Sequence, residues 1–385
     1  MRIQQTLEKY VPLISNMLIP ALIYIIALLY FLAANDFNAS LGMFFHNGFY
    51  VLSILGIIIL LNFNINRHMF CLIVNLIAYV LINQIKREYG AEFEQTICFG
   101  YLMILLPLNL LIFYILGRFR FLSVRSLQLV MLILLEYGIA DVLNKHNINL
   151  NISFLGVNIL SCFFYFLLIL IAFIKSVNSN RNYDYTFMYV AISTATGLYF
   201  AENSTGLSMF FFIAQLIIFI DLVYTLTYNH FYDETTGFYS RNSYLLKSKH
   251  FPFKYNLGIV SIDNYDKLQK TFGYKKQKIL TNLIAEVIQE LTPEEEVFRY
   301  AADQFVVLYK DKDNKESFAH LDNIRRIIAG LSFSWSIKQK PIKLTVSCSL
   351  AEKKRSDASS IEVLMRADKA MQKTLKFSHN VTSRG

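Results

Sequence analysis

The chain has few cysteines and few charged residues for its length. Only 4 of its 385 residues are Cys and 17% are charged, whereas 55% are hydrophobic. The four cysteines are Cys71, Cys98, Cys162 and Cys348. They lie too far apart in the sequence to match a disulfide framework or a zinc site. We therefore expect them to be small buried hydrophobic side chains. The sequence also lacks an internal repeat and a low-complexity tract, and the apolar run after residues 1–10 is too long for a cleaved signal peptide.

Charge is distributed unevenly along the chain. From Asn229 onward there are 26 Lys or Arg against 18 Asp or Glu, which accounts for 8 of the 9 net positive charges. The first part is too apolar for a soluble protein. This composition predicts a transmembrane domain over 1–228, a short linker over 229–232 and a soluble domain over 233–385. We expect the membrane, and no nucleic acid, as a partner.

Apolar stretches of roughly 20 residues predict an α-helical transmembrane bundle of about eight spans. Their approximate bounds are 11–34, 47–63, 68–84, 96–117, 121–143, 152–175, 186–202 and 207–228. With the N-terminus inside, eight Lys or Arg residues near the span ends lie on the inner side and three on the outer side. Both termini are therefore expected in the cytoplasm.

Two acidic residues inside these spans are candidates for a function of the membrane domain. Asp221 lies well inside the last span, and no residue near it in sequence can neutralise it. Because an unpaired charge in a membrane is costly, we expect Asp221 to face the bundle interior and to take part in coupling or ligand sensing. Glu136, toward the outer end of the fifth span, is the second candidate. The paired broken helices that are typical of many carriers are not apparent.

The soluble half contains a hairpin pattern at 297–310, where two runs of β-branched and aromatic residues flank a short turn. Arg299–Phe305, reading RYAADQF, resembles the RYGGDEF hairpin of the diguanylate cyclase (GGDEF) family, whose members condense two GTP into cyclic di-GMP. Other family motifs are similar, in the same order, to 233–241, 259–274, 344–351 and 367–380. The resemblance implies an α/β domain of ferredoxin-like palm type and, because the family is bacterial, a place in a bacterial cytoplasmic membrane.

The chain departs from the family at the positions that the resemblance implies for catalysis. The metal-binding Asp of the family's first strand falls on Ser261, and the acidic pair of the hairpin falls on Asp303 and Gln304. The two turn glycines fall on Ala301 and Ala302. Because Ala disfavours a positive φ, we expect a different turn geometry, with Asp303 in that conformation.

The positions that the resemblance implies for nucleotide binding are also altered. The family's base-contacting Asn and Asp match Gln269 and Lys278, and its phosphate-binding Lys and Arg match Leu375 and His379. Lys278 reverses the charge of the residue it replaces. We therefore expect no nucleotide site of the family's kind.

These differences favour a degenerate, catalytically inactive GGDEF-like protein that is anchored in the membrane. It would act as a regulatory or interaction module in exopolysaccharide or cyclic di-GMP signalling, with no cofactor unless residual activity requires Mg²⁺. The resemblance implies an exopolysaccharide synthase component, a genuine cyclase or a second copy as partner. Three alternatives stay open: a weak cyclase that uses Asp303, a domain that binds a nucleotide without turnover, and a membrane-domain receptor or carrier.

Overall fold

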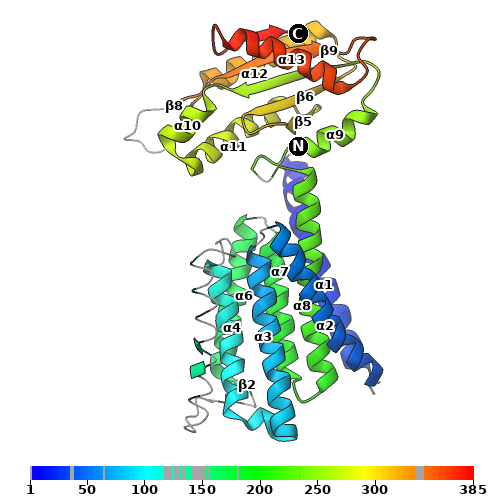
Figure 1. The fold of residues 1–385 in the computed structure, drawn as a ribbon, viewed down its shortest axis with the longest axis vertical. Coiled ribbons are helices and arrows are strands. Elements are labelled where there is room, and N and C mark those ends of the chain that lie inside the picture. Colours follow the sequence, from blue (N-terminus) through cyan, green and yellow to red (C-terminus); the bar gives the residue numbers. More distant parts are fainter. Residues whose placement is uncertain are drawn as a thin grey trace. The chain divides into compact units, whose positions relative to one another are not determined.

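The computed structural model of the chain divides into two compact units, residues 1–224 and 225–385 (Figure 1). The structure describes residues 2–34, 39–63, 66–116, 153–154, 157–179, 182–233, 235–333 and 342–385, together with isolated positions between 124 and 142. Each unit is described separately below.

The first unit is built from long apolar helices that run side by side (Figure 1). They are α1 (Arg2–Ala33), α2 (Ala39–Phe63), α3 (Asn66–Tyr89), α4 (Ile97–Leu116), α6 (Ile159–Ser179), α7 (Asn182–Tyr199) and α8 (Ser204–Phe231). A short 3-10 helix η1 (Gly90–Gln95) follows α3, and a small hairpin of β1 (Ser153–Phe154) and β2 (Val157–Asn158) precedes α6. Neighbouring pairs include α1 with α7, α2 with α3, α3 with α4, and α6 with both α4 and α7.

Five of these helices are long and apolar enough to cross a membrane. The apolar segments are Ser40–Leu61, His68–Tyr89, Ile97–Ile115, Ile159–Ser176 and Ser204–Phe231. They coincide with five of the eight predicted spans. The first predicted span falls on α1, whose described apolar part is the shorter Met17–Ala33, and the seventh falls on α7, which is not among the five. The fifth, 121–143, lies almost entirely outside the described residues, so the described chain supports five span candidates instead of eight.

Polar side chains inside this unit bond across helices, as expected where lipid offers no alternative partner. The hydroxyl of Tyr79 on α3 donates to Ser208 Oγ on α8 at 2.8 Å and lies 2.8 Å from His46 Nδ1 on α2. On the next turns of α8, the amide of Gln215 donates to Ser53 Oγ at 2.8 Å. These bonds join α2, α3 and α8 over several helical turns.

The second unit is an α/β domain around a six-stranded mixed sheet of order β10-β9-β4-β6-β5-β3. The strands are β3 (Tyr239–Ser240), β4 (Tyr255–Ile262), β5 (Glu296–Arg299), β6 (Gln304–Lys310), β9 (Val346–Glu352) and β10 (Thr382–Arg384). Strand β4 pairs antiparallel with both β6 and β9, while the two edge strands pair parallel to their neighbours. A separate small ladder joins β7 (Ser332–Phe333) to β8 (Ile342–Lys343).

Helices cover both faces of this sheet (Figure 1). On one face α11 (Tyr274–Leu291) and α12 (Asn314–Gly330) pack against alternate residues of β4, β6 and β9. On the other face lie α9 (Arg241–Lys247) and α13 (Ser360–Leu375). The short helices η2 (Ser248–His250) and α10 (Tyr265–Phe272) complete the domain. All eight residues of β4 are buried, which fits its run YNLGIVSI. The expected fold class, a helical membrane region followed by an α/β domain of this type, is confirmed.

The four cysteines are free, and the expectation that all are buried is confirmed for two of them and wrong for Cys162. Cys71 and Cys348 are buried and Cys98 is half-buried, but Cys162 is exposed. Cys162 lies on α6 beside the exposed Phe163, so α6 turns this part of its surface outward. An outward apolar surface suits a helix that faces lipid.

Replacing Gly258 should destabilise the domain. A Cβ at Gly258 would lie 3.0 Å from Leu321 Cδ1 of α12 and 3.2 Å from Tyr309 Cε2 of β6, so there is no room for a side chain. We expect Gly258→Val to lower the free energy of unfolding by about 1–3 kcal/mol, as overpacking does. Pulse proteolysis in urea, carried out on the whole purified chain, measures the free energy of unfolding of this domain.

Gly330→Ala provides the matched control. Nothing lies within 4 Å of the Cβ position at Gly330, at the end of α12. The change in unfolding free energy should stay within about 0.5 kcal/mol. Equal stability of the Gly258→Val chain and the unmodified chain would show that α12 does not pack closely on β4.

Candidate functional site

The hairpin turn between β5 and β6 closes without a residue at positive φ. Arg299 pairs with Phe305, and the amides of Tyr300 and Ala301 both donate to the carbonyl of Gln304, at 3.0 and 3.2 Å. Among the described residues other than Gly, only Asn264, Asp311 and Asn380 have a positive φ. The prediction that Asp303 adopts that conformation is therefore wrong. Because two amides share one carbonyl, the loop is wider and needs no residue at positive φ.

The segment 233–241 braces this turn. The Arg299 guanidinium donates through Nη2 to the carbonyl of Ala302, and its Nη1 lies 3.7 Å from Asp233 Oδ1. The same Asp233 oxygen accepts from the amide and hydroxyl of Thr236, at 2.9 and 2.8 Å. Gly237 then turns the chain with φ +72°, which favours Gly. The hairpin tip is thus held by a neighbouring loop of the same domain.

The positions that the resemblance implies for metal binding meet at the end of β4. Ser261 pairs with Gln304 in the sheet, and its hydroxyl donates to Asp303 Oδ2 at 3.2 Å. Ser261 is buried, whereas Asp303 and Gln304 are half-buried. Partial burial and the nearby charge of Asp303 raise the pKa of Asp368 on α13 above its ordinary value. Asp303 and Asp368 are 65 positions apart, so no local sequence pattern brings the two carboxylates together.

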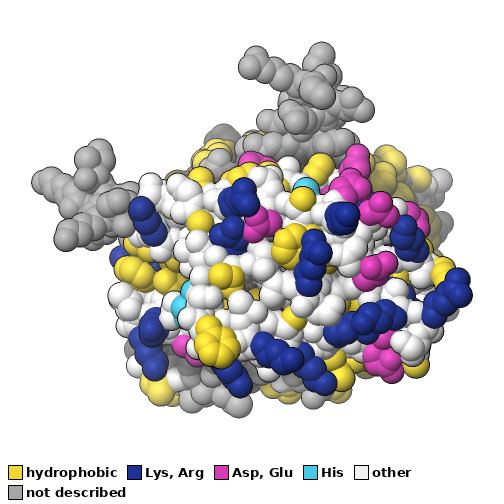
Figure 2. Space-filling view, turned by 90° about the horizontal axis from the view of Figure 1, so that it is seen from above, with side chains coloured by type: hydrophobic (Ala, Val, Ile, Leu, Met, Phe, Trp, Pro, Cys, Tyr) yellow, Lys and Arg dark blue, Asp and Glu magenta, His cyan; other side chains and the backbone are white. Residues whose placement is uncertain are grey.

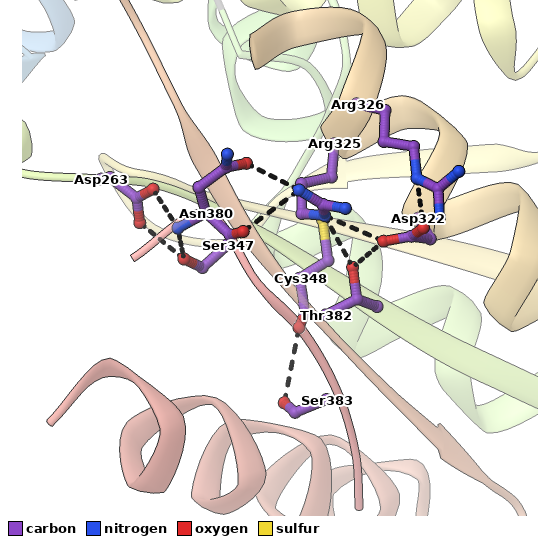
Figure 3. A network of polar contacts seen from close by, with 9 residues as sticks. All are labelled: Asp263, Asp322, Arg325, Arg326, Ser347, Cys348, Asn380, Thr382 and Ser383. Carbon is purple, nitrogen blue, oxygen red and sulfur yellow. Dashed lines mark hydrogen bonds and ion pairs between the residues drawn. The ribbon is translucent and has the colours of Figure 1, made fainter. Parts of the chain in front are cut away.

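Asp263, two residues further on, is fully occupied by the scaffold (Figure 3). Its Oδ2 accepts from Thr345 Oγ1 at 2.7 Å and from the amide of Asn380 at 3.0 Å. Its Oδ1 accepts from Ser347 Oγ at 2.7 Å and lies 3.5 Å from Nδ1 of the exposed His379. This carboxylate joins the end of β4 to β9 and to the C-terminal segment.

The same network continues into α12 (Figure 3). Arg325 Nη1 donates to the carbonyl and side-chain oxygens of Asn380, at 3.1 and 2.9 Å. Asp322 accepts from Arg325 and from Thr382 Oγ1. Burial raises the pKa of Asp322, but these hydrogen bonds outweigh burial and hold that pKa below its ordinary value. His379 therefore lies at the margin of a structural network.

A cavity of about 310 Å³ lies beside the hairpin tip. It contains Ala301 and Ala302 in its wall, together with the charged side chains of Asp233, Lys278 and Arg299. Tyr265, Tyr274 and Tyr300 supply aromatic surface. The cavity thus combines two cationic groups with one carboxylate, and that carboxylate faces Arg299.

The remaining predicted positions do not line this cavity. Gln269 is exposed on α10, and Leu375 packs partly buried against the core beneath α13. Ser261, Asp303 and Gln304 are likewise outside its wall. Within the described residues, no group of three or more His, Cys, Asp or Glu side chains lies close enough together to hold a metal ion.

In the first unit (residues 1–224), which we call the membrane unit, Asp221 has a partner that sequence reasoning missed. Its side chain is 6% exposed, and its Oδ2 lies 2.7 Å from Nε2 of His68 on α3. The two residues are 153 positions apart, so no local pattern could pair them. Glu136 is half-buried, but most residues around it lie outside the described part of the chain.

The comparisons with known proteins concern the C-terminal part of the chain. The family model "Diguanylate cyclase, GGDEF domain" matches residues 230–380, and a search of curated proteins finds no match. The GGDEF domain of DgcB from Caulobacter crescentus, in complex with c-di-GMP, is 19% identical; the match covers 40% of this chain and 92% of that chain, with TM-score 0.37. The active GGEEF domain of a diguanylate cyclase from Vibrio cholerae is 15% identical, with coverages of 37% and 89% and TM-score 0.33. The FimX GGDEF domain from Pseudomonas aeruginosa is 18% identical, with coverages of 40% and 99% and TM-score 0.36.

The C-terminal part therefore belongs to the diguanylate cyclase-like class of α/β domains. More narrowly, residues 230–380 form a GGDEF domain, and the region before it contains five helices able to span a membrane.

The roles assigned to Asp263 and Asp303 predict losses of stability of different size when each carboxylate is removed. Asp263→Ala would leave the hydroxyls of Thr345 and Ser347 without their acceptor and the amide of Asn380 with Ser347 Oγ as its remaining acceptor, so the free energy of unfolding should fall by about 3 kcal/mol or more. Asp303→Ala removes one 3.2 Å hydrogen bond and should cost about 1 kcal/mol or less. Pulse proteolysis of both purified variants measures the difference. Equal losses would show that Asp263 is not the structural member of the pair.

Proposed function

We propose that this GGDEF domain does not condense GTP and instead works as a membrane-anchored regulatory or interaction module. The observation that carries the proposal is the hydrogen bond from Ser261 to Asp303. The neutral hydroxyl of Ser261 occupies one of the metal positions that the resemblance implies, and it donates a hydrogen bond to the carboxylate of Asp303 at the other. Gln304, beside them, adds an uncharged amide.

The residues present do not fit a magnesium site of the kind that the family resemblance implies. Mg²⁺ prefers oxygen ligands, chiefly carboxylates, in near-octahedral geometry. Asp263 is poorly placed to serve, because three hydrogen bonds from the scaffold already hold its two oxygens. Asp303 is the carboxylate that Ser261 contacts, and Asp368 lies close enough to Asp303 for partial burial and that charge to raise its pKa. The presence of a second carboxylate beside Asp303 favours weak cyclase activity as the second candidate function.

The surface of the domain supports an interaction role. Figure 2 shows Lys and Arg side chains spread over one face of the C-terminal domain, with Asp and Glu mostly toward one side of the view. This agrees with the excess of Lys and Arg after Asn229. A cationic surface favours an acidic partner. The partners we propose are an exopolysaccharide synthase component, a genuine cyclase or a second copy of this chain, at a bacterial cytoplasmic membrane with both termini inside.

The direct test is GTP turnover by the purified whole chain with Mg²⁺ or Mn²⁺. We expect no cyclic di-GMP above the level given by Asp303→Ala, because too little negative charge is left near Ser261 to hold the metal. Product formation can be followed by chromatography. Turnover that Asp303→Ala abolishes would contradict the proposal and establish the weak cyclase.

A restored variant separates metal loss from other causes. Ser261→Asp combined with Gln304→Glu adds two carboxylates beside Asp303. We expect this double variant to bind Mn²⁺ more tightly than the unmodified chain, which electron paramagnetic resonance measures without requiring turnover. Equal Mn²⁺ affinity in both proteins would show that these two positions do not limit metal binding.

A further inference from the structure

A second cavity, of about 60 Å³, lies within the membrane unit between α1, α7 and α8. Most of its wall is aliphatic, with Ile19 and Ile23 from α1 and Ile217 from α8. Two buried polar side chains interrupt this wall, Thr186 of α7 and Asp221 of α8. The cavity therefore presents an acceptor carboxylate and a hydroxyl in otherwise apolar surroundings.

Asp221 makes this cavity chemically selective. One of its oxygens, Oδ2, is held by His68 Nε2 at 2.7 Å, which fixes the carboxylate in place. A carboxylate has about four lone-pair sites and can accept further hydrogen bonds. A buried carboxylate favours a cationic donor, because such a donor offsets the cost of the charge as well as completing hydrogen bonds.

The size of the cavity limits what can enter it. A cavity of roughly 150 Å³ is known to admit benzene, so about 60 Å³ accepts only a small head group. On α1, Ile19 is 51% exposed although it also lines the cavity, and Leu22 and Ile26 continue its exposed side at helical spacing. An aliphatic tail can therefore lie along α1 while the head group reaches Asp221.

We propose that this cavity binds the primary ammonium group of an amphiphile, with the ammonium between Asp221 and Thr186 and the aliphatic tail against the exposed side of α1. An ammonium group has three donors, enough for both side chains. An alcohol of the same length would fill the space without neutralising Asp221. Binding at this site would give the membrane unit a ligand separate from anything the GGDEF domain contacts.

The test uses the whole chain in phosphatidylcholine nanodiscs, which contain no primary amine. Octylamine is the probe and octanol is the neutral control, each measured by calorimetry. We expect saturable octylamine binding that is about 10-fold or more weaker in Asp221→Asn, which removes the charge and keeps the shape. Thr186→Val should weaken it by about 3- to 10-fold. Octanol should bind the unmodified chain and Asp221→Asn equally.

A further variant covers the case in which Asp221→Asn fails to fold. Ile217→Phe fills the cavity from α8 and leaves Asp221 and His68 unchanged. It should abolish saturable octylamine binding. Octylamine binding that is unchanged in Ile217→Phe, or equal in the unmodified chain and Asp221→Asn, would overturn the proposal. So would octanol binding as tightly as octylamine, because the cavity would then be merely apolar or filled by water.

Nanodiscs that contain phosphatidylethanolamine distinguish the two sources of such an ammonium group. If the lipid occupies the site, the apparent octylamine affinity falls as the phosphatidylethanolamine fraction rises. If a soluble amine is the ligand, that affinity stays constant. Either result supports the ammonium site provided that octylamine binding itself is weaker in Asp221→Asn.

Discussion

The domain depends on one strand whose two faces and two edges are all occupied. Strand β4 is buried along its whole length, with β6 on one edge and β9 on the other. Its C-terminal end therefore has a fixed position relative to the hairpin and to the segment that follows α13. Ser261 and Asp263 leave this end two residues apart, yet one faces the hairpin carboxylate and the other is enclosed by the scaffold. The end of the strand thus directs Ser261 to the hairpin carboxylate and Asp263 to the structural hydrogen bonds.

Much of the domain follows from local pattern. The alternation and β-branched content of 255–262 and 304–310 predict β4 and β6, and the structure forms both strands within a residue or two of the expected bounds. Hydrophobic periodicity likewise locates α11 and α13. The geometry of the turn at 300–303 could not be predicted from local pattern. It depends on which amides share the Gln304 carbonyl, and residue preferences alone do not specify that.

The site and the membrane unit were less predictable, since their key contacts join distant parts of the chain. The charge of Asp303 raises the pKa of Asp368 across 65 positions, and His68 reaches Asp221 across 153. Neither pair has a spacing that periodicity can detect. In the membrane region, apolar length indicates that a segment is a candidate span but not which polar residues face one another. Helix packing decides that, and it places His68 of α3 opposite Asp221 of α8.

The distribution of hydrogen bonds explains how a GGDEF domain can keep its fold while its metal positions change. Asp263 joins β4, β9 and the C-terminal segment, so substituting it would take an acceptor from Thr345, Ser347 and Asn380. Position 261 carries one side-chain bond, to the half-buried Asp303. A Ser at 261 therefore costs the fold little, whereas under the proposed function a divalent metal would lose a charged ligand there. On this proposal stability and metal binding rest on different residues, so the second could be lost without the first.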